Sequence, residues 1–282
     1  MARDALRLPT DAARVARTAV AEAGALIHAR WRKAKRIEYK GAVDLVTETD
    51  RDAEALVVAQ LRRAFPDHHI VAEEGSVGVT LHTPPADAYV WYLDPLDGTT
   101  NFAHAYPQFC VSLGLSRGPT PLLGIVYDPV RDETFFAARG AGATLNGRPI
   151  RVSATSDFGR ALIGTGFPYD RRDRADFYLG FVADFLKRAL DVRRGGSAAL
   201  DLCYVACGRF DAFWEWKLHP WDTAAAALIV REAGGTISDF RGKPFDVYGD
   251  QTLASNTHLH PAMIRVLRRR LRRSTVPLTK GD

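Results

Sequence analysis

The chain has 282 residues, of which 46% are hydrophobic and 25% are charged, and its formal net charge is +5. This composition is typical of a globular protein and excludes a disordered, collagen-like or coiled-coil chain. No run approaches the roughly 20 apolar residues of a membrane-spanning helix, and the 3 cysteines predict no disulfide framework, which favours a reducing cytoplasm.

Apolar residues at helical spacing open the chain. They predict a capped amphipathic helix from Thr10 to Ile27 and a second helix from Thr49 to Leu61, which ends before Pro66. Short β-prone runs punctuated by Gly, Pro and Asp follow, and their spacing predicts an antiparallel sheet. The runs cover residues 89–93, 109–115, 122–127 and 133–138, and a tight-turn signal stands at 146–147.

Beyond about residue 153, strand and helix patterns alternate, which predicts an α/β layer. The expected strands cover residues 161–164, 210–216 and 236–239, and the expected helices cover 173–190, 197–207 and 221–233. We therefore expect two halves, residues 1–153 and 154–282. They should pack closely, because no linker rich in Pro and Gly separates them.

The most informative run begins where a β-prone segment reaches Asp94. Pro95 is expected to end the strand, because proline has no N–H for the ladder. Asp94 and Asp97 would then share a tight turn, where two close carboxylates repel each other unless cations lie between them. Mg²⁺ prefers oxygen ligands, and the carbonyl of Leu96 can add one.

The residues after Asp97 favour a phosphate site beside these carboxylates. Gly98 and Thr99 can present backbone N–H groups to an anion. An isolated Asp-x-x-Asp-Gly is more often a plain turn. The whole run 94–102 is more specific than that motif.

Three further acidic segments accompany this run. Glu73 and Glu74 follow an apolar stretch, Asp222 opens the predicted helix 221–233, and Asp50 stands at the start of the second helix of the chain. Each has an ordinary alternative, which is a solvated loop for the glutamates and a helix-capping or first-turn carboxylate for the aspartates. Each segment is weak evidence alone, and it is their order along the chain together with the run 94–102 that indicates a common site.

Together these segments resemble the inositol monophosphatase family, and most closely its bacterial inositol-1-monophosphatases of the extragenic-suppressor type. The first family signature stands at residues 94–102, and the second begins at 221–226 and ends at 232–235. Residues 40–50, 73–74, 164–168 and 196–201 also fit, in order. The resemblance implies a mixed α/β fold, the layered αβαβα sandwich shared with fructose-1,6-bisphosphatases. It also implies a homodimer and an active site between the two halves.

The resemblance implies that a phosphate monoester, inositol monophosphate or a related polyol phosphate, is hydrolysed by direct attack of water. Two to three Mg²⁺ ions take part, and Li⁺ inhibits. The implied metal ligands are Glu73, Asp94, the Leu96 carbonyl, Asp97 and Asp222. The implied catalytic residues are Asp50, Thr99 and Glu73.

The remaining implied roles concern the substrate and its surroundings. Gly98 and Thr99 hold the phosphate, and the alcohol is held by Asp97, Ala198 and Glu215. Glu74 is expected beside a metal without clearly binding it, and Lys40 in a loop that closes over the third metal. The plain alternative for Glu215 is an exposed strand end.

Other substrates of the same site stay open at this point. Lys217 stands where family members usually have a small or apolar residue, so it could contact a second anionic group. This keeps fructose-1,6-bisphosphatase and nucleotide bisphosphatase activities possible. Trp221 counts mildly against a histidinol-phosphatase, which more often has tyrosine there.

The C-terminal region suggests a function of another class. Six arginines stand among the nine residues 265–273, with apolar residues at helical spacing between them. A docked helix with a solvated basic face is the favoured interpretation. The alternative is an RNA-associated regulatory protein, although aromatic residues that would stack on bases are missing from this segment.

Overall fold

The computed structural model describes residues 8–33, 37–39, 45–75 and 84–273. The helices are α1 (Ala12–Arg30), α2 (Glu48–Ala64), α3 (Thr99–Ala103), α4 (Ala175–Leu186), α5 (Ala198–Ala206), α6 (Pro220–Glu232) and α7 (His260–Arg273). The strands are β1 (Ile37–Tyr39), β2 (Leu45–Thr47), β3 (His69–Ala72), β4 (Tyr89–Asp97), β5 (Cys110–Arg117), β6 (Thr120–Asp128), β7 (Glu133–Ala138), β8 (Ala143–Leu145), β9 (Arg148–Pro149), β10 (Leu162–Thr165), β11 (Asp191–Arg193), β12 (Ala212–Trp216), β13 (Thr236–Ser238) and β14 (Gln251–Ser255). In this part of the chain, no helix is long and apolar enough to cross a membrane.

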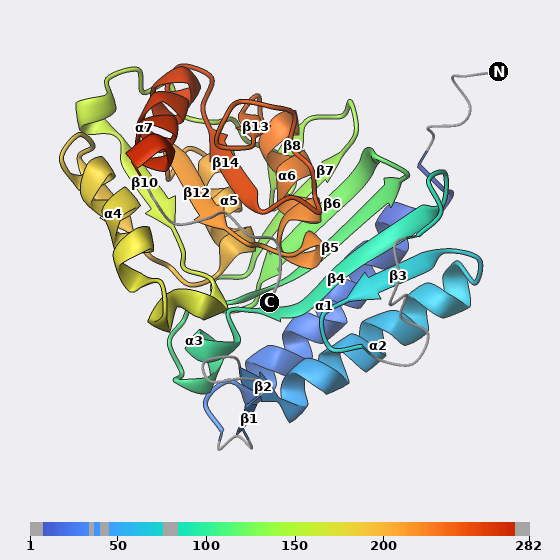
Figure 1. Ribbon diagram of the computed structural model, residues 1–282. Helices are drawn as coiled ribbons and strands as arrows, with labels where there is room; N and C mark the ends of the chain where they lie inside the picture. The colour runs from blue at the N-terminus through green and yellow to red at the C-terminus, as the bar shows by residue number, and fades with distance from the viewer. Residues whose placement is uncertain (1–7, 34–36, 40–44, 76–83, 274–282) are drawn as a thin grey trace.

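Two large sheets alternate with three helical layers, and β1 and β2 form a separate two-stranded sheet (Figure 1). The first sheet has the strand order β3-β4-β5-β6-β7-β8-β9, and all its pairs are antiparallel except β3 with β4. The second sheet is mixed, with the order β11-β10-β12-β14-β13. Helices α1 and α2 cover the outer face of the first sheet, α5 and α6 lie between the sheets, and α4 and α7 cover the second sheet. The expectation of an αβαβα layered fold is confirmed.

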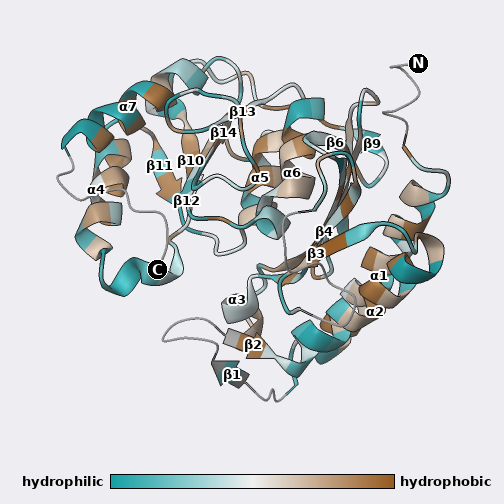
Figure 2. Ribbon diagram, turned by 45° about the vertical axis from the view of Figure 1, so that its right-hand side comes forward, coloured by the Kyte–Doolittle hydropathy of each residue, from teal (hydrophilic) through white to brown (hydrophobic). Residues whose placement is uncertain are grey.

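Each interface between layers has its own apolar core. One core joins α1 and α2 to the first sheet, a second surrounds α5 and α6, and a third joins α4 and α7 to the second sheet. Figure 2 shows apolar and polar residues alternating along the outer helices, and the apolar residues of α1 and α2 belong to the first core. Cys203 is fully buried in the middle core, where it packs among apolar side chains.

Helix α6 approaches the first sheet closely because two glycines face it. A Cβ on Gly124 would lie 2.3 Å from the carbonyl oxygen of Ala225, and a Cβ on Gly114 would lie 2.9 Å from the nitrogen of the same residue. Neither backbone can yield without moving the helix. The two glycines therefore set the height of α6, and with it the position of Asp222 in its first turn.

Most elements expected from the local pattern are present, and the differences have physical causes. Thr10 is not the cap of α1, because the capping position is Asp11, whose backbone is left-handed (φ 65°). The pattern missed β14, since its residues, Gln251 to Ser255, mix polar and small side chains without clear alternation. This strand is nevertheless buried, because it lies between β12 and β13.

We expect acid to destabilise the docking of α7 through His260. This imidazole is 7% exposed, and it meets Ser238 Oγ at 2.9 Å and Ser255 Oγ at 2.7 Å. Burial lowers the pKa of His260 to about 4, so the folded state favours the neutral ring. The corresponding stability is present above the unfolded pKa of about 6.5 and is lost as the pH falls toward 4.

The free energy of unfolding should therefore decrease by about 2 kcal/mol from pH 7 to pH 5 through this group. Urea unfolding of the natural chain and of His260→Gln at both pH values measures the effect. The natural chain should lose more stability than the variant over this interval, and equal losses would contradict the assignment.

Candidate active site

A β-bulge in β4 brings the two aspartates of the first signature to one face. Asp94 pairs with Ser112 and Asp97 with Cys110, so Pro95 and Leu96 together oppose the single residue Val111. In a regular strand, residues three apart point to opposite faces. The extra residue reverses this alternation, and both carboxylates line the same cavity. The expectation that Pro95 ends the strand is wrong, because a bulge accommodates a residue that cannot donate to the ladder.

The cavity gathers residues from both sheets. It is lined by Glu73 after β3, by Asp94, Leu96 and Asp97 of β4, by Gly98 and Thr99, by Ala198 of α5, by Glu215 of β12 and by Asp222 of α6. Asp94 and Asp97 are buried, and Asp222 is half-buried. Segments that lie more than a hundred residues apart in the chain thus meet at one point.

These carboxylates repel each other. Burial raises the pKa of Asp94 well above its usual range, and the charges of Glu73, Asp97 and Asp222 raise it further. Burial and the charge of Asp97 likewise raise the pKa of Asp222, which lies within hydrogen-bonding reach of Asp94. Such a group is stable only when protons or cations neutralise it.

The donor set consists of oxygen atoms, which suits a hard divalent cation. Backbone N–H groups already orient two of these carboxylates. Leu96 N donates to Asp94 Oδ1 at 2.9 Å, and His219 N donates to Asp222 Oδ2 at 2.7 Å. Among the described residues, no three His, Cys, Asp or Glu side chains form a complete metal-ligand set as they stand. Rotation of the carboxylates would be needed to complete one.

Asp50 and Thr99 form a pair beside the cavity. Thr99 Oγ1 lies 3.0 Å from Asp50 Oδ1 and 3.1 Å from the Leu96 carbonyl oxygen, and its single proton can serve one of them at a time. Asp50 is not the N-cap of α2. That position belongs to Thr47, whose backbone N–H donates to Asp50 Oδ2 at 2.9 Å in a capping box. Burial raises the pKa of Asp50, and the hydrogen bonds from Thr47 and Thr99 oppose that shift.

Asp97 connects β4 of the first sheet to the start of helix α5. Its Oδ2 accepts hydrogen bonds from Ser197 Oγ and Ala199 N, both at 2.7 Å, and its Oδ1 accepts one from Ala198 N at 3.3 Å. These donors belong to the start of α5, where backbone N–H groups have no partner within the helix. Asp97 is therefore held by the second half of the chain.

Glu215 is buried, so the alternative of an exposed strand end is excluded. Its side chain lies against Gly166, where a Cβ would stand 2.2 Å from the carboxylate oxygens. Burial raises the pKa of Glu215 to about 8, while the charges of Arg194 and Arg171 oppose the shift. Glu215 and both arginines line the cavity, which gives this side of it mixed charge.

Lys217 lines the cavity but already has a carboxylate partner. Its Nζ lies 3.0 Å from Asp170 Oδ2, and the Tyr178 hydroxyl donates to Asp170 Oδ1 at 2.7 Å. Burial alone would raise the pKa of Asp170, but the hydrogen bonds from Tyr178 and Lys217 hold it below its usual value. The backbone of Lys217 is left-handed (φ 55°), a conformation that glycine adopts without strain.

Of the expected residues that the structure describes, Asp50 and Glu74 are not among those lining the cavity. Glu74 is held through its backbone N–H, which donates to Glu54 Oε2 of α2 at 2.7 Å. Lys40 lies outside the described residues.

The sequence did not single out Arg194, Ser197 or Asp201 for a role, yet all three line the cavity. Asp201 is 1% exposed, and its Oδ1 has no hydrogen-bond partner. Asp201 stands four residues after Ser197, about one turn along the same helix, and this spacing could have indicated that the two side chains share a face.

Comparison with known proteins agrees with this arrangement. The model of the inositol monophosphatase family matches residues 9–272. An inositol-1-monophosphatase of Synechocystis sp. is 46% identical over 254 residues, which is 90% of this chain and 87% of the relative. A Nus factor SuhB of Pseudomonas aeruginosa is 44% identical over 260 residues, which is 90% of this chain and 94% of the relative.

A solved structure gives the same result for the fold. The inositol monophosphatase of Anabaena (Nostoc) sp. superposes with a TM-score of 0.81 at 40% identity, covering 91% of this chain and 94% of that one. The sequence match, the shared fold and the carboxylate-lined cavity agree, and the chain belongs to the inositol monophosphatase family.

Proposed function

We propose that the chain is a Mg²⁺-dependent phosphatase that releases phosphate from inositol monophosphate or a related polyol phosphate. The observation that carries the proposal is the group of four mutually repelling carboxylates, Glu73, Asp94, Asp97 and Asp222, on one cavity wall. Metal ions would neutralise them and at the same time attract a phosphate dianion.

The residues that would hold Mg²⁺ are these four carboxylates and the Leu96 carbonyl. When bound, Mg²⁺ lowers the charge of the phosphoryl group and acidifies water. The backbone N–H groups of Gly98 and Thr99 are proposed to hold the phosphate, since both residues line the cavity next to the aspartates.

The proton of the attacking water is proposed to pass to Asp50 through the Thr99 hydroxyl. The 3.0 Å hydrogen bond between Thr99 Oγ1 and Asp50 Oδ1 supports this path. Burial raises the proton affinity of Asp50, which suits a general base. Glu73 is proposed to assist the same water.

The alcohol half of the substrate is proposed to lie against Glu215, Asp97 and the backbone at Ala198. Carboxylate oxygens accept hydrogen bonds from vicinal hydroxyls, which suits a polyol. Because Asp170 already neutralises Lys217, this lysine is not a ready site for a second phosphate. Arg171 and Arg194 also line the cavity and could contact a second phosphate, so bisphosphate substrates are included in the test.

Phosphate release from a substrate panel tests the proposal. The panel contains inositol-1-phosphate, fructose-1,6-bisphosphate, adenosine 3′,5′-bisphosphate and histidinol phosphate, each with Mg²⁺ and with EDTA. We expect Mg²⁺-dependent release with a preference for inositol-1-phosphate. Preference for a bisphosphate would assign Arg171 and Arg194 to the substrate instead, and no release from any compound would refute the proposal. Inhibition by Li⁺ and a homodimeric state are proposed on the family resemblance and are checked on the same preparation.

Glu215→Gln should separate the alcohol site from the phosphate site. It removes a charged acceptor from the polyol, so we expect KM for inositol-1-phosphate to rise about tenfold, with little change in KM for p-nitrophenyl phosphate. Steady-state kinetics with both substrates measure the effect. An equal change with the two substrates would return Glu215 to a purely structural role.

A second candidate function rests on the outer face of α7. Five exposed arginines share this face, at positions 265, 268, 269, 272 and 273, and the stripe spans about 12 Å at the helical rise of about 1.5 Å per residue. Within the described part of the chain, none of them has a carboxylate within ion-pair distance, whereas Arg270 on the inner side pairs with Asp184 at 3.9 Å. One of the relatives of this chain is named as a Nus factor, which also favours testing this function. We propose RNA binding along the stripe as an additional function.

The test must leave α7 in place, because Met263 and Leu267 belong to the third core. The variant Arg265→Gln/Arg268→Gln/Arg272→Gln should weaken binding of a single-stranded RNA and flatten its dependence on log salt by about 2 units. The control Arg63→Gln/Arg139→Gln/Arg148→Gln has the same change in charge at exposed sites elsewhere. Equal binding by both triple variants would remove the candidate.

A further inference from the structure

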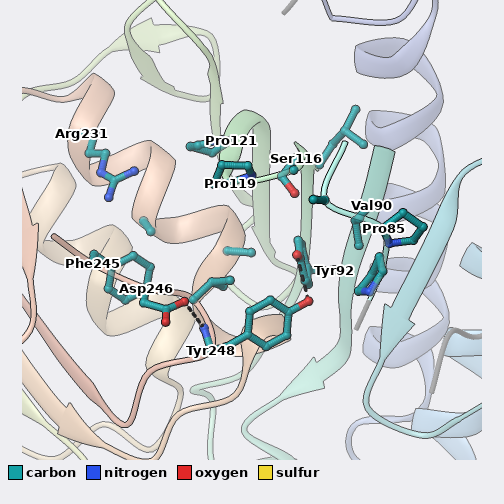
Figure 3. Close-up of a pocket in the computed structure, with 17 residues that line it drawn as sticks. Pro85, Val90, Tyr92, Ser116, Pro119, Pro121, Arg231, Phe245, Asp246 and Tyr248 are labelled. Carbon is teal, nitrogen blue, oxygen red and sulfur yellow. Dashed lines mark hydrogen bonds between the residues drawn. The ribbon is translucent and has the colours of Figure 1, made fainter. Parts of the chain in front are cut away.

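A second cavity, of about 280 Å³, lies along the seam between α6 and the first sheet (Figure 3). Its walls come from β4, β5, α6 and the segment that follows β13. None of its lining residues lines the carboxylate cavity. It is therefore a separate site, and its volume is near the lower end of the roughly 300–1,000 Å³ found for small-molecule pockets.

Ser116 places an unsatisfied hydroxyl on the wall of this cavity. Its side chain is 8% exposed, and its Oγ has no hydrogen-bond partner. Figure 3 shows this oxygen on the cavity side of β5. A buried polar atom without a partner is unfavourable, so a ligand group that bonds to it would recover that cost.

Arg231 of α6 supplies a positive charge on another wall. Within the described residues, no carboxylate lies within ion-pair distance of its guanidinium, whose Cζ lies 5.9 Å from the centroid of the Phe245 ring. Arg231 is exposed at the rim of the cavity, and partial burial of its guanidinium lowers its pKa. Asp246 is also exposed at the rim, and its Oδ1 accepts the Tyr248 N–H at 3.0 Å.

The remaining walls are flat and mostly apolar. The rings of Tyr92 and Tyr248 meet edge to face, with centroids 6.2 Å apart and their hydroxyl groups 3.2 Å apart. Phe245 and several prolines complete the slot. Rigid rings and proline side chains favour a planar ligand, because they offer wide faces at little cost in conformational entropy.

We propose that this cavity binds a small aromatic carboxylic acid with a second polar group on its ring. The carboxylate would pair with Arg231, the ring would lie between Phe245 and the tyrosine pair, and the ring substituent would hydrogen-bond to Ser116. The argument is independent of the proposed phosphatase activity, since no residue of that site takes part.

Ligand-observed NMR on the full chain, with saturating phosphate and Mg²⁺ present to occupy the carboxylate cavity, tests the proposal. The probes are 4-hydroxybenzoate, benzoate, which lacks the hydroxyl, and 4-hydroxybenzamide, which lacks the charge. We expect 4-hydroxybenzoate to bind with a Kd on the order of 1 mM, and each of the other two to bind more weakly.

Two variants locate the probe. Arg231→Gln should weaken binding of 4-hydroxybenzoate at least tenfold, and Ser116→Ala should weaken it severalfold while leaving benzoate binding unchanged. Arg139→Gln, an exposed arginine outside the cavity, is the control, and unchanged melting temperatures show that the variants fold. No saturation transfer at 10 mM probe, equal binding of the amide, or full binding by Arg231→Gln would each overturn the proposal.

Discussion

Asp94→Asn is expected to lower kcat for phosphate release on the order of 10³-fold. Asp94 is the carboxylate on which the charges of Glu73, Asp97 and Asp222 all act, so it lies at the centre of the proposed metal-binding group. Removing its charge weakens cation binding and removes electrostatic stabilisation of the transition state. Asp222→Asn should have a comparable effect, because this residue lies within hydrogen-bonding reach of Asp94.

The same substitution should not destabilise the metal-free protein. The raised pKa of Asp94 means that folding costs free energy when this group is charged, and an amide relieves that cost. We therefore expect the melting temperature of Asp94→Asn in EDTA to equal or exceed that of the natural chain. Mg²⁺ should raise the melting temperature of the natural chain more than that of the variant.

Asp184→Asn is the matched control. Asp184 is 9% exposed, and it lies on α4 near Arg188 and Arg270, away from the residues that line the active-site cavity. Its kcat should be unchanged, with some loss of stability from the ion pairs. A kcat of Asp94→Asn close to the natural value would contradict the metal assignment, whatever its stability.

Thr99→Val is expected to lower kcat roughly 10²- to 10⁴-fold, the range typical of general acid–base groups. Valine keeps the shape of threonine and removes only the hydroxyl that bonds to Asp50 Oδ1. KM should change much less than kcat, because proton transfer contributes in the transition state. Thr99→Ser keeps the hydroxyl and should retain most of the activity.

Asp50→Asn tests the other member of the pair, but it also alters the capping box of α2 through Thr47. A double-mutant cycle with Thr99→Val separates the two effects. If the residues act as one relay, the double variant should be no slower than the slower single variant. Independent, multiplicative losses, or equal activity of Thr99→Val and Thr99→Ser, would refute the relay.

The local pattern of the chain was sufficient for much of the fold. The strand Glu133–Ala138 matches its predicted bounds, and α6 and the strand β13 begin and end within one residue of theirs. Such segments can be predicted because the periodicity of apolar side chains indicates which face is buried. Several other strands of three residues were missed, β1, β2 and β11 among them, since so few residues rarely show a period.

The residues of the candidate site could also be predicted from the sequence, because a signature such as 94–102 contains several chemically specific side chains in one short run. The geometry of these residues could not be predicted. Pro95 was expected to stop its strand, and only the pairing with β5 shows that it lies in a bulge that turns Asp97 to the side of Asp94. That pairing depends on residues thirteen or more positions away along the chain.

The sequence by itself determined the chemistry: which residues carry carboxylates, where helices and strands form, and to which family the chain belongs. Only the tertiary structure decided which of these groups meet and which charges are already matched. Glu215 is buried against Gly166, Lys217 is neutralised by Asp170, and Asp97 is held by the start of α5. The reason is physical: burial and electrostatic pairing depend on distances in space, and the folding of distant segments sets those distances.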